Sequence, residues 1–129
     1  MSKLLFTTLA LATSCALAND SLENLIELKS TTQFEQLLKE KSIVVVDFHA
    51  TWCGPCRQQG PIVHDMAKKY PEICFIKIDV DQFRDLSAKY NIASIPTILY
   101  FKNGTQVKRA SAGVQKESAF KIAFNELKK

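Results

Sequence analysis

The chain has 129 residues and a formal net charge of +4, from 17 Lys and Arg residues against 13 Asp and Glu residues. This length fits one domain, which can bury a core without disulfide or metal support. Basic residues are spread along the chain apart from the terminal pair Lys128-Lys129, so no basic patch indicates a nucleic-acid partner. The composition is that of a soluble globular protein, with no internal repeat and no low-complexity tract.

The first eighteen residues differ from the rest of the chain. Lys3 is their only charged residue, an apolar run follows over residues 4–11, and Ala16-Leu17-Ala18 has the small-x-small pattern after which signal peptidase cuts. The run is short for a membrane span, and a mitochondrial presequence would carry several arginines. We therefore predict a signal peptide over residues 1–18. The mature chain would be residues 19–129, exported to a periplasm, the endoplasmic reticulum lumen or the extracellular space, without stable membrane insertion.

Two alternatives remain for this segment. One is an N-terminal helix of the domain, although such a helix adds an apolar element that the fold does not need. The other is a lipid anchor on Cys15, although Ala12-Thr13-Ser14 before it is a poor lipobox. Removal of residues 1–18 would leave three cysteines, at positions 53, 56 and 74.

The predicted elements follow one another from residue 22. The run over residues 22–28 is apolar enough for a short strand. Ser30-Thr31-Thr32 offers N-caps for a helix, and Thr32 and Glu35 have capping-box spacing. Residues 43–48 are nearly all apolar, as expected of a strand covered on both faces. The later pattern predicts a helix over 56–70 with Pro61 inside it, a strand over 74–80, a helix over 81–90, strands over 97–102 and 105–110 joined by Asn103-Gly104, and a helix over 116–127.

This order of elements predicts the fold class. Strands that are linked by helices pair in parallel, and the closing hairpin adds an antiparallel part. We therefore expect an α/β domain with a central mixed sheet, helices on both faces, and the element order β-α-β-α-β-α-β-β-α.

The tetrad Cys53-Gly54-Pro55-Cys56 follows the most apolar strand and opens a predicted helix. Two cysteines at this spacing serve as a structural staple, as half of a zinc site or as a reversible redox pair. A closed zinc site needs four ligands, and His49, His64 and Cys74 are scattered singly along the chain. The strand-then-helix context therefore favours a redox pair.

The position of each cysteine predicts a division of labour. Backbone N–H groups at a helix start are unpaired and the helix dipole is positive there, so a thiolate is stabilised. Cys53 lies at that end, and we expect it to be an exposed nucleophile of lowered pKa. Cys56, one turn further in, would then attack the mixed disulfide that Cys53 makes.

Two groups of residues resemble the thioredoxin family. Trp52-Cys53-Gly54-Pro55-Cys56 after Val46-Asp47-Phe48 is similar to its active site, and Ile95-Pro96-Thr97 followed by Phe101-Lys102-Asn103-Gly104 is similar to its second landmark. The resemblance runs from about Leu25 to the C-terminus. It implies the thioredoxin fold and a monomeric protein-disulfide reductase without a bound cofactor, which acts on protein disulfides and is re-reduced by an upstream reductant.

The resemblance also implies roles for individual residues. Asp47 would be a buried acid behind Cys56 that takes the proton of this cysteine, whereas an aspartate facing solvent is the alternative. Lys77 matches a lysine near that acid, and the alternative is an exposed position on the strand. Ile95-Pro96 matches a cis-proline site opposite the cysteines, where the residue before proline pairs with an extended substrate chain. The substrate surface would comprise Trp52, Gly54, Pro55, Ile95, Pro96 and the loop at Ala112 or Gly113.

Two single residues stay open at this point. His49 stands where many thioredoxins have Trp or a small residue, and it shares a strand face with Asp47. It either perturbs the proton balance of the thiolate or is an ordinary, partly exposed histidine. Cys74 is interpreted most simply as a small buried hydrophobic residue.

Two other functions are weighed against a reductase. An exported address favours an oxidase or isomerase, because secretory compartments are oxidising. Gly54-Pro55 is instead the dipeptide of reducing family members, whose potential lies near about −270 mV, compared with about −120 to −180 mV for oxidising ones. The second rival is a binding subunit without activity, which the presence of both cysteines, Asp47 and the Ile95-Pro96 pair disfavours.

Overall fold

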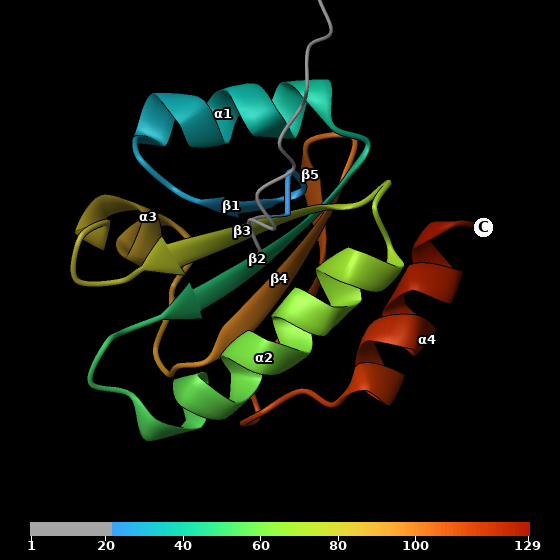
Figure 1. Ribbon diagram of the computed structural model, residues 1–129. Coiled ribbons are helices and arrows are strands. Elements are labelled where there is room, and N and C mark those ends of the chain that lie inside the picture. The colour runs from blue at the N-terminus through green and yellow to red at the C-terminus, as the bar shows by residue number, and fades with distance from the viewer. Residues whose placement is uncertain (1–21) are drawn as a thin grey trace, which may run out of the picture.

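The computed structural model describes residues 22–129, so the signal peptide, its cleavage point and Cys15 lie outside the described residues. The described chain forms one five-stranded sheet and four helices in the predicted order (Figure 1). In chain order, the elements are β1 (Leu25–Glu27), α1 (Thr31–Glu40), β2 (Ile43–His49), α2 (Gly54–Lys69), β3 (Cys74–Asp79), α3 (Arg84–Lys89), β4 (Thr97–Lys102), β5 (Thr105–Ala110) and α4 (Glu117–Leu127).

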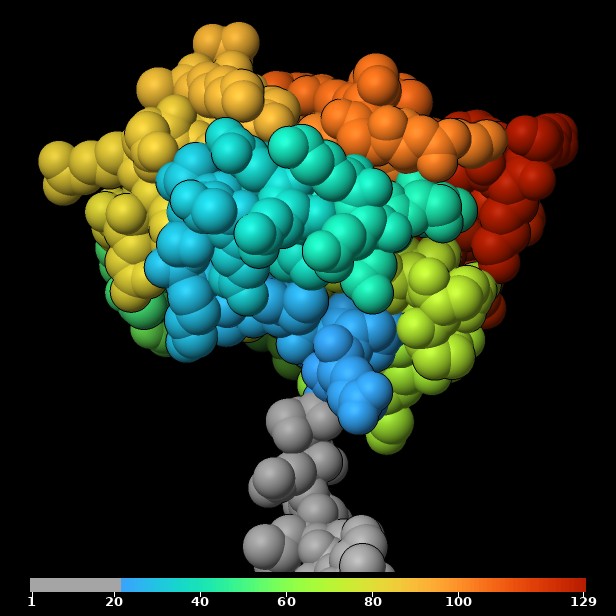
Figure 2. Space-filling view, turned by 90° about the horizontal axis from the view of Figure 1, so that it is seen from above, coloured from blue at the N-terminus to red at the C-terminus, as the bar shows by residue number. Residues whose placement is uncertain are grey.

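The sheet is mixed, as predicted. Its strand order is β1-β3-β2-β4-β5, with β3 parallel to both β1 and β2, and with antiparallel pairs β2–β4 and β4–β5. Helices α1 and α3 cover one face and helices α2 and α4 cover the other (Figure 1). Seen from the α1 side, this helix fills the centre of its face, with α3 on one side and the β4–β5 hairpin beside it (Figure 2). No helix among residues 22–129 is long and apolar enough to cross a membrane.

Strand β2 is the central strand and separates two cores. Val44, Val46 and Phe48 point into the core under α1 and α3, whereas Val45 points into the core under α2 and α4. Alternation along the strand therefore places Asp47 on the α2 side of the sheet. Each buried apolar side chain of this kind stabilises the fold by roughly 1.5–3 kcal/mol, so β2 is fixed in register by both faces.

The first strand is shorter than predicted. Residues 22–24 form a turn, in which the N–H of Leu25 donates to the carbonyl of Leu22 at 3.2 Å. The side-chain amide of Asn24 donates to three backbone carbonyls near the end of α2, namely those of Ala67, Tyr70 and Ile73, at 2.9, 3.1 and 3.0 Å. Asn24 thus joins this turn to α2, and only Leu25–Glu27 pairs with β3.

The helix starts confirm one prediction and correct two others. The N-cap of α1 is Ser30, one of the three predicted candidates, and its hydroxyl accepts from the N–H of Gln33 at 3.1 Å. The expected capping box of Thr32 with Glu35 is therefore wrong. Helix α3 begins only at Arg84, because the preceding residues form a turn in which the carboxylate of Asp79 accepts from the N–H of Asp81 at 2.8 Å.

Candidate active site

The cysteine pair lies at the N-terminus of α2. Cys53 is the N-cap residue, and the helix begins at Gly54, two residues earlier than predicted. Cys53 and Cys56 are joined by a disulfide with Cα atoms 5.3 Å apart, within the usual range for such bonds. The N–H of Cys56 donates to Sγ of Cys53 at 3.2 Å. The prediction that Cys53 occupies the positive end of a helix is therefore confirmed, and in the reduced protein this N–H favours its thiolate.

The predicted exposure of Cys53 is wrong for this disulfide form. Cys53 is 4% exposed and Cys56 is 7% exposed. Both cysteines pack with Ala50 in a small apolar cluster, and Val80 and Ile95 pack against it. Little of either cysteine is therefore open to solvent in this form.

The Ile95–Pro96 segment lies opposite the cysteines. Its peptide bond is cis, as the resemblance implies. The carbonyl oxygen of Ile95 is 3.8 Å from Sγ of Cys53, and Pro96 is buried. The hydroxyl of Thr97 donates to the carbonyl of Ser94 at 2.6 Å and closes the turn before β4. A backbone edge is thus presented next to Sγ of Cys53.

The expected substrate surface surrounds this edge. Trp52 is 67% exposed, and its indole N–H donates to the carboxylate of Asp81 at 2.8 Å. Gly54 and Pro55 are exposed at the start of α2. In the β5–α4 loop, Gly113 has φ of +77°, a left-handed conformation in which glycine is favoured. The expected substrate surface therefore has one exposed aromatic side chain, that of Trp52, beside the small residues Gly54, Pro55 and Gly113.

Asp47 is buried behind the disulfide. It is 1% exposed, and burial raises the pKa of its carboxyl from 3.8 to about 7, while the nearby charge of Lys77 acts in the opposite direction. Lys77 is its register partner on β3. Asp47 and Cys56 line one cavity of about 480 Å³, whose other walls are Leu25, His49, Ala50, Thr51, Arg57, Gly60, Pro61, His64 and Lys77.

The structure also locates the two single residues that the sequence left open. His49 lines the same cavity, and its Nε2 atom is 3.5 Å from a carboxylate oxygen of Glu27. Burial lowers the pKa of His49, and so does the charge of Lys77. Cys74 is a free, buried thiol whose pKa is raised by burial to about 11, which agrees with its prediction as a buried hydrophobic residue. Among residues 22–129, no three His, Cys, Asp or Glu side chains form a group that could hold a metal ion.

Gln59 is a site residue that the sequence analysis missed. Gln59 is a residue of α2, and its side chain is fully buried. Its amide nitrogen donates to the carbonyl of Gln115 at 3.0 Å, and its oxygen accepts from the N–H of Gln115 at 2.6 Å. The side chain of Gln115 in turn donates to the carbonyl of Gly113 at 3.1 Å. These bonds hold the β5–α4 loop against the helix that carries the cysteines.

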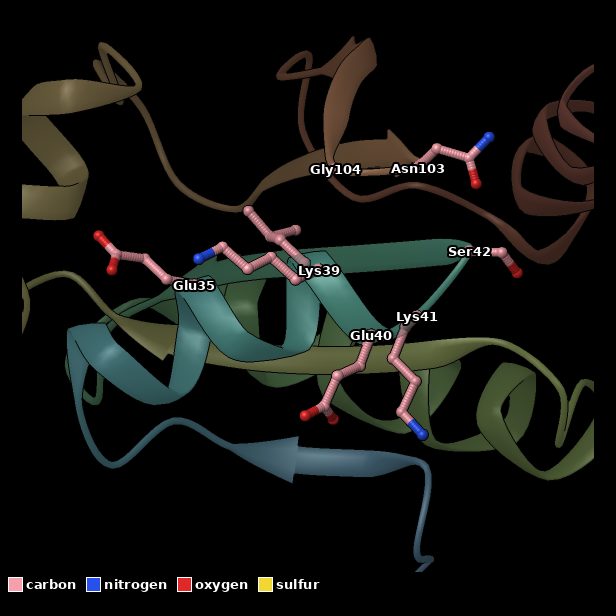
Figure 3. Close-up of a pocket in the computed structure, with 8 residues that line it drawn as sticks. Glu35, Lys39, Glu40, Lys41, Ser42, Asn103 and Gly104 are labelled. Atoms are coloured by element: carbon pink, nitrogen blue, oxygen red, sulfur yellow. The ribbon is translucent and has the colours of Figure 1, made fainter.

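A second hollow of the described chain lies elsewhere. It has a volume of about 650 Å³ and lies between the C-terminal half of α1 and the β4–β5 turn at Asn103 and Gly104 (Figure 3). The N–H of Asn103 donates to the carbonyl of Ser42, just before β2, whereas Cys53 follows the other end of this strand. The hollow and the disulfide are therefore at opposite ends of the sheet.

Comparisons with known proteins agree with this geometry. The family model described as Thioredoxin matches residues 25–125. An H-type thioredoxin of Picea mariana is 37% identical over 92 residues, which are 71% of this chain and 74% of that protein. The solved structure of a thioredoxin variant of Halobacterium salinarum covers 84% of this chain with 95% of its own, at 29% identity and a TM-score of 0.77. The thioredoxin of Fasciola hepatica covers 78% of this chain with 96% of its own, at 39% identity and a TM-score of 0.71.

Proposed function

Because the chain belongs to the thioredoxin family and is a thiol-disulfide oxidoreductase, we propose that it reduces the disulfide bonds of other proteins and is re-reduced by an upstream reductant. The observation that carries this proposal is the Cys53–Cys56 disulfide at the N-terminus of α2, with the carbonyl of Ile95 beside Sγ of Cys53. In the oxidised protein this disulfide is an electrophile, and in the reduced protein the Cys53 thiolate is a nucleophile. In both states the reacting sulfur lies next to a backbone edge with which a peptide can pair.

The first step is attack on the substrate. The thiolate of reduced Cys53 attacks one sulfur of the substrate disulfide, forms a mixed disulfide and expels the other substrate sulfur as a thiolate, which takes a proton from water. The helix N-terminus and the N–H of Cys56 stabilise the attacking thiolate. An extended substrate chain pairs with the backbone at Ile95, beside Trp52, Gly54, Pro55 and Gly113.

The second step resolves the mixed disulfide. The carboxylate of Asp47 takes the proton of the Cys56 thiol, and the resulting thiolate attacks Sγ of Cys53. This forms the observed disulfide and releases the second substrate sulfur, so two electrons have passed to the substrate. With a pKa near about 7, Asp47 can accept and return a proton close to neutral pH, which is the property a general base needs.

A trapping experiment tests this division of labour. Cys56→Ser removes the resolving thiol, so substrates should stay covalently bound to Cys53 on a non-reducing gel after incubation with cell extract. Cys53→Ser should trap almost nothing, and Cys74→Ser should behave like the parent. Peptide mapping identifies the bonded cysteine. Equal trapping by both active-site variants, or adducts on Cys74, would contradict the assignment.

The reduction potential separates a reductase from an oxidase or isomerase. Gly54-Pro55 between the cysteines supports a reducing protein, for which we expect a potential near about −270 mV. Equilibration with glutathione redox buffers measures this value. A potential in the range of about −120 to −180 mV would favour oxidation or isomerisation instead.

Export is a separate proposal. It is supported by Lys3, the apolar run over residues 4–11 and Ala16-Leu17-Ala18. Cleavage after Ala18 would yield a mature chain of residues 19–129. N-terminal sequencing of the protein from its native cells should begin at Asn19 or within a few residues of it. Recovery of a chain with intact Met1 from the cytosol would overturn the proposal.

A further inference from the structure

Two residues that line the cavity behind the disulfide each have a buried polar atom without a hydrogen bond to any of residues 22–129. Asp47 Oδ1 and His49 Nε2 are both buried, and within the described chain neither has a hydrogen-bond partner. Both residues line the cavity of about 480 Å³ that also contacts Cys56. A cavity of this size admits several water molecules, and such waters bond to buried polar atoms of this kind.

Exposure rises in steps from Asp47 toward solvent. The Asp47 residue is 1% exposed, the His49 side chain is 14% exposed and the Glu27 side chain is 51% exposed. Asp47 and His49 lie two residues apart on the same face of β2, and Glu27 comes from β1 at the sheet edge. His49 Nε2 is 3.5 Å from Glu27 Oε1, so Asp47, His49 and Glu27 form a series of titratable groups that leads from the buried site to solvent.

We propose that His49 is a proton-transfer residue of this site, which carries protons between Asp47 and bulk water with Glu27 as its outer partner. The inference rests on the proposed reductase function, and it assigns to His49 a role that the cysteines and Asp47 do not supply. A buried carboxyl that accepts a proton must also release it before the next turnover. The imidazole is suited to this exchange because its ordinary titration lies closer to neutral pH than that of any other side chain.

The proton balance of the path is simple. The thiol of Cys56 loses its proton to Asp47 as its sulfur bonds to Cys53. Protonated Asp47 then passes this proton through water to neutral His49, and the imidazolium releases it to solvent beside Glu27. When an upstream reductant reopens the disulfide, the same groups return a proton to Cys56. No oxidant or reductant enters these steps.

Burial and the charges around His49 together favour its neutral form. The carboxylate of Glu27 on β1 and that of Asp79, its register partner on β3, favour imidazolium, whereas burial and Lys77 favour neutral imidazole, and the sum lowers the pKa of His49. On its own strand Asp47 is the neighbouring titratable group, and Arg57 and His64 of α2 also line the cavity. A neutral imidazole that gains and loses a proton readily is what this transfer requires.

Chemical rescue tests the proposal on the full chain. His49→Ala should slow steady-state reduction of insulin over many turnovers by roughly tenfold, since water replaces the imidazole less effectively. Added free imidazole should restore the rate in proportion to its concentration, because the cavity can admit it. His49→Gln, which fills the site but cannot titrate, should be slow and should not respond to imidazole. Melting curves show whether both variants are folded, and His49→Gln keeps the test valid if the Ala variant is not.

His64→Ala is the matched control, because it removes the other imidazole that lines the same cavity. Added imidazole should leave the rate of this variant unchanged, because the rescue is specific to the position of His49. Glu27→Gln should shift the acidic limb of the pH–rate profile to lower pH. The charge of Glu27 raises the pKa of both His49 and Asp47, so the shift should be smaller when His49→Gln is also present. Parent-like rates and pH profiles in both His49 variants, or a folded His49→Ala protein without imidazole response, would overturn the role of His49. Failure of the parent to reduce insulin would overturn the proposed function instead.

Discussion

The side-chain amide of Gln59 makes a reciprocal pair of hydrogen bonds with the backbone of Gln115, at 3.0 and 2.6 Å. The two residues are 56 positions apart, and their contact joins the cysteine-bearing helix to the loop before α4. Gln115 also holds the carbonyl of Gly113, so one buried amide sets the position of a loop on the expected substrate surface. This contact gives the first prediction.

Gln59→Met keeps the length of the side chain but removes both hydrogen bonds. We expect a loss of about 1–3 kcal/mol in the free energy of unfolding, because backbone groups of Gln115 lose their partner. The loop should become mobile, so KM for insulin should rise while kcat changes little. Urea unfolding and steady-state kinetics measure the two effects. Gln58→Met is the control, because Gln58 is exposed on the same helix, and similar kinetics of both variants would contradict the role of Gln59.

The second prediction concerns pH and the burial of Asp47. In the disulfide form neither active-site cysteine titrates, so Asp47 can be followed without them. Its pKa is 3.8 as an ordinary carboxyl and about 7 in the fold, so the native state binds more protons between these values and stability falls as pH rises through this window. Below this window, the ionisation of Asp47 does not reduce the free energy of unfolding. Above it, the cost of ionising the buried carboxyl reduces the free energy of unfolding by a constant amount, roughly 4 kcal/mol.

Asp47→Asn removes this penalty. The variant should be more stable than the parent, and its advantage should be roughly 3 kcal/mol larger at about pH 8 than at about pH 5. Urea unfolding of both oxidised proteins at the two pH values measures the difference. The variant should also reduce insulin more slowly near neutral pH, because Cys56 loses its proton acceptor. A stability difference independent of pH would show that Asp47 is not perturbed by burial.

Much of the fold is predictable from local sequence. Strands β4 and β5 have the predicted bounds, because Asn103-Gly104 fixes the hairpin between them. The cysteine tetrad and Ile95-Pro96 also lie where the resemblance to thioredoxin places them, opposite one another. The late start of α3 depends on a local turn between Asp79 and Asp81, whereas the bounds of β1 depend on contacts between distant segments. The turn at Asn24 is stabilised by carbonyls of α2 more than 40 residues away, which no local pattern indicates.

The same reason explains what was missed in the site. The burial of Cys53 comes from Val80 and Ile95, which belong to other segments of the chain. A glutamine inside a helix is usually exposed, and only the packed loop reveals why Gln59 is buried. The pairing of His49 with Glu27 crosses an intervening strand, so it depends on sheet order rather than on spacing along the chain.

The third prediction concerns Cys74. Burial raises the pKa of its thiol to about 11, so at about pH 8 roughly one such thiol in a thousand is ionised, and the side chain is also shielded from reagents. Iodoacetamide should therefore label Cys53 in the reduced, folded protein and leave Cys74 unmodified. Mass spectrometry of tryptic peptides measures the labelling. Cys74 should react only in denaturant, and its modification in the folded protein would contradict the shielding.

The last prediction uses the single tryptophan of the chain. Trp52 is the only tryptophan in the sequence, so fluorescence reports directly on the residue before the reactive cysteine. Its indole N–H donates to Asp81 at 2.8 Å while most of the ring faces solvent. Asp81→Ala removes this acceptor, so the ring should rotate more freely and its fluorescence anisotropy should fall. The free energy of unfolding should change by less than about 1 kcal/mol, because water replaces an exposed hydrogen bond. KM for insulin should rise, since a mobile ring must be ordered when substrate binds.

Asp85→Ala is the matched control, because Asp85 accepts from Thr31 and leaves Trp52 untouched. Equal anisotropy in the two variants would show that Asp81 does not hold the ring.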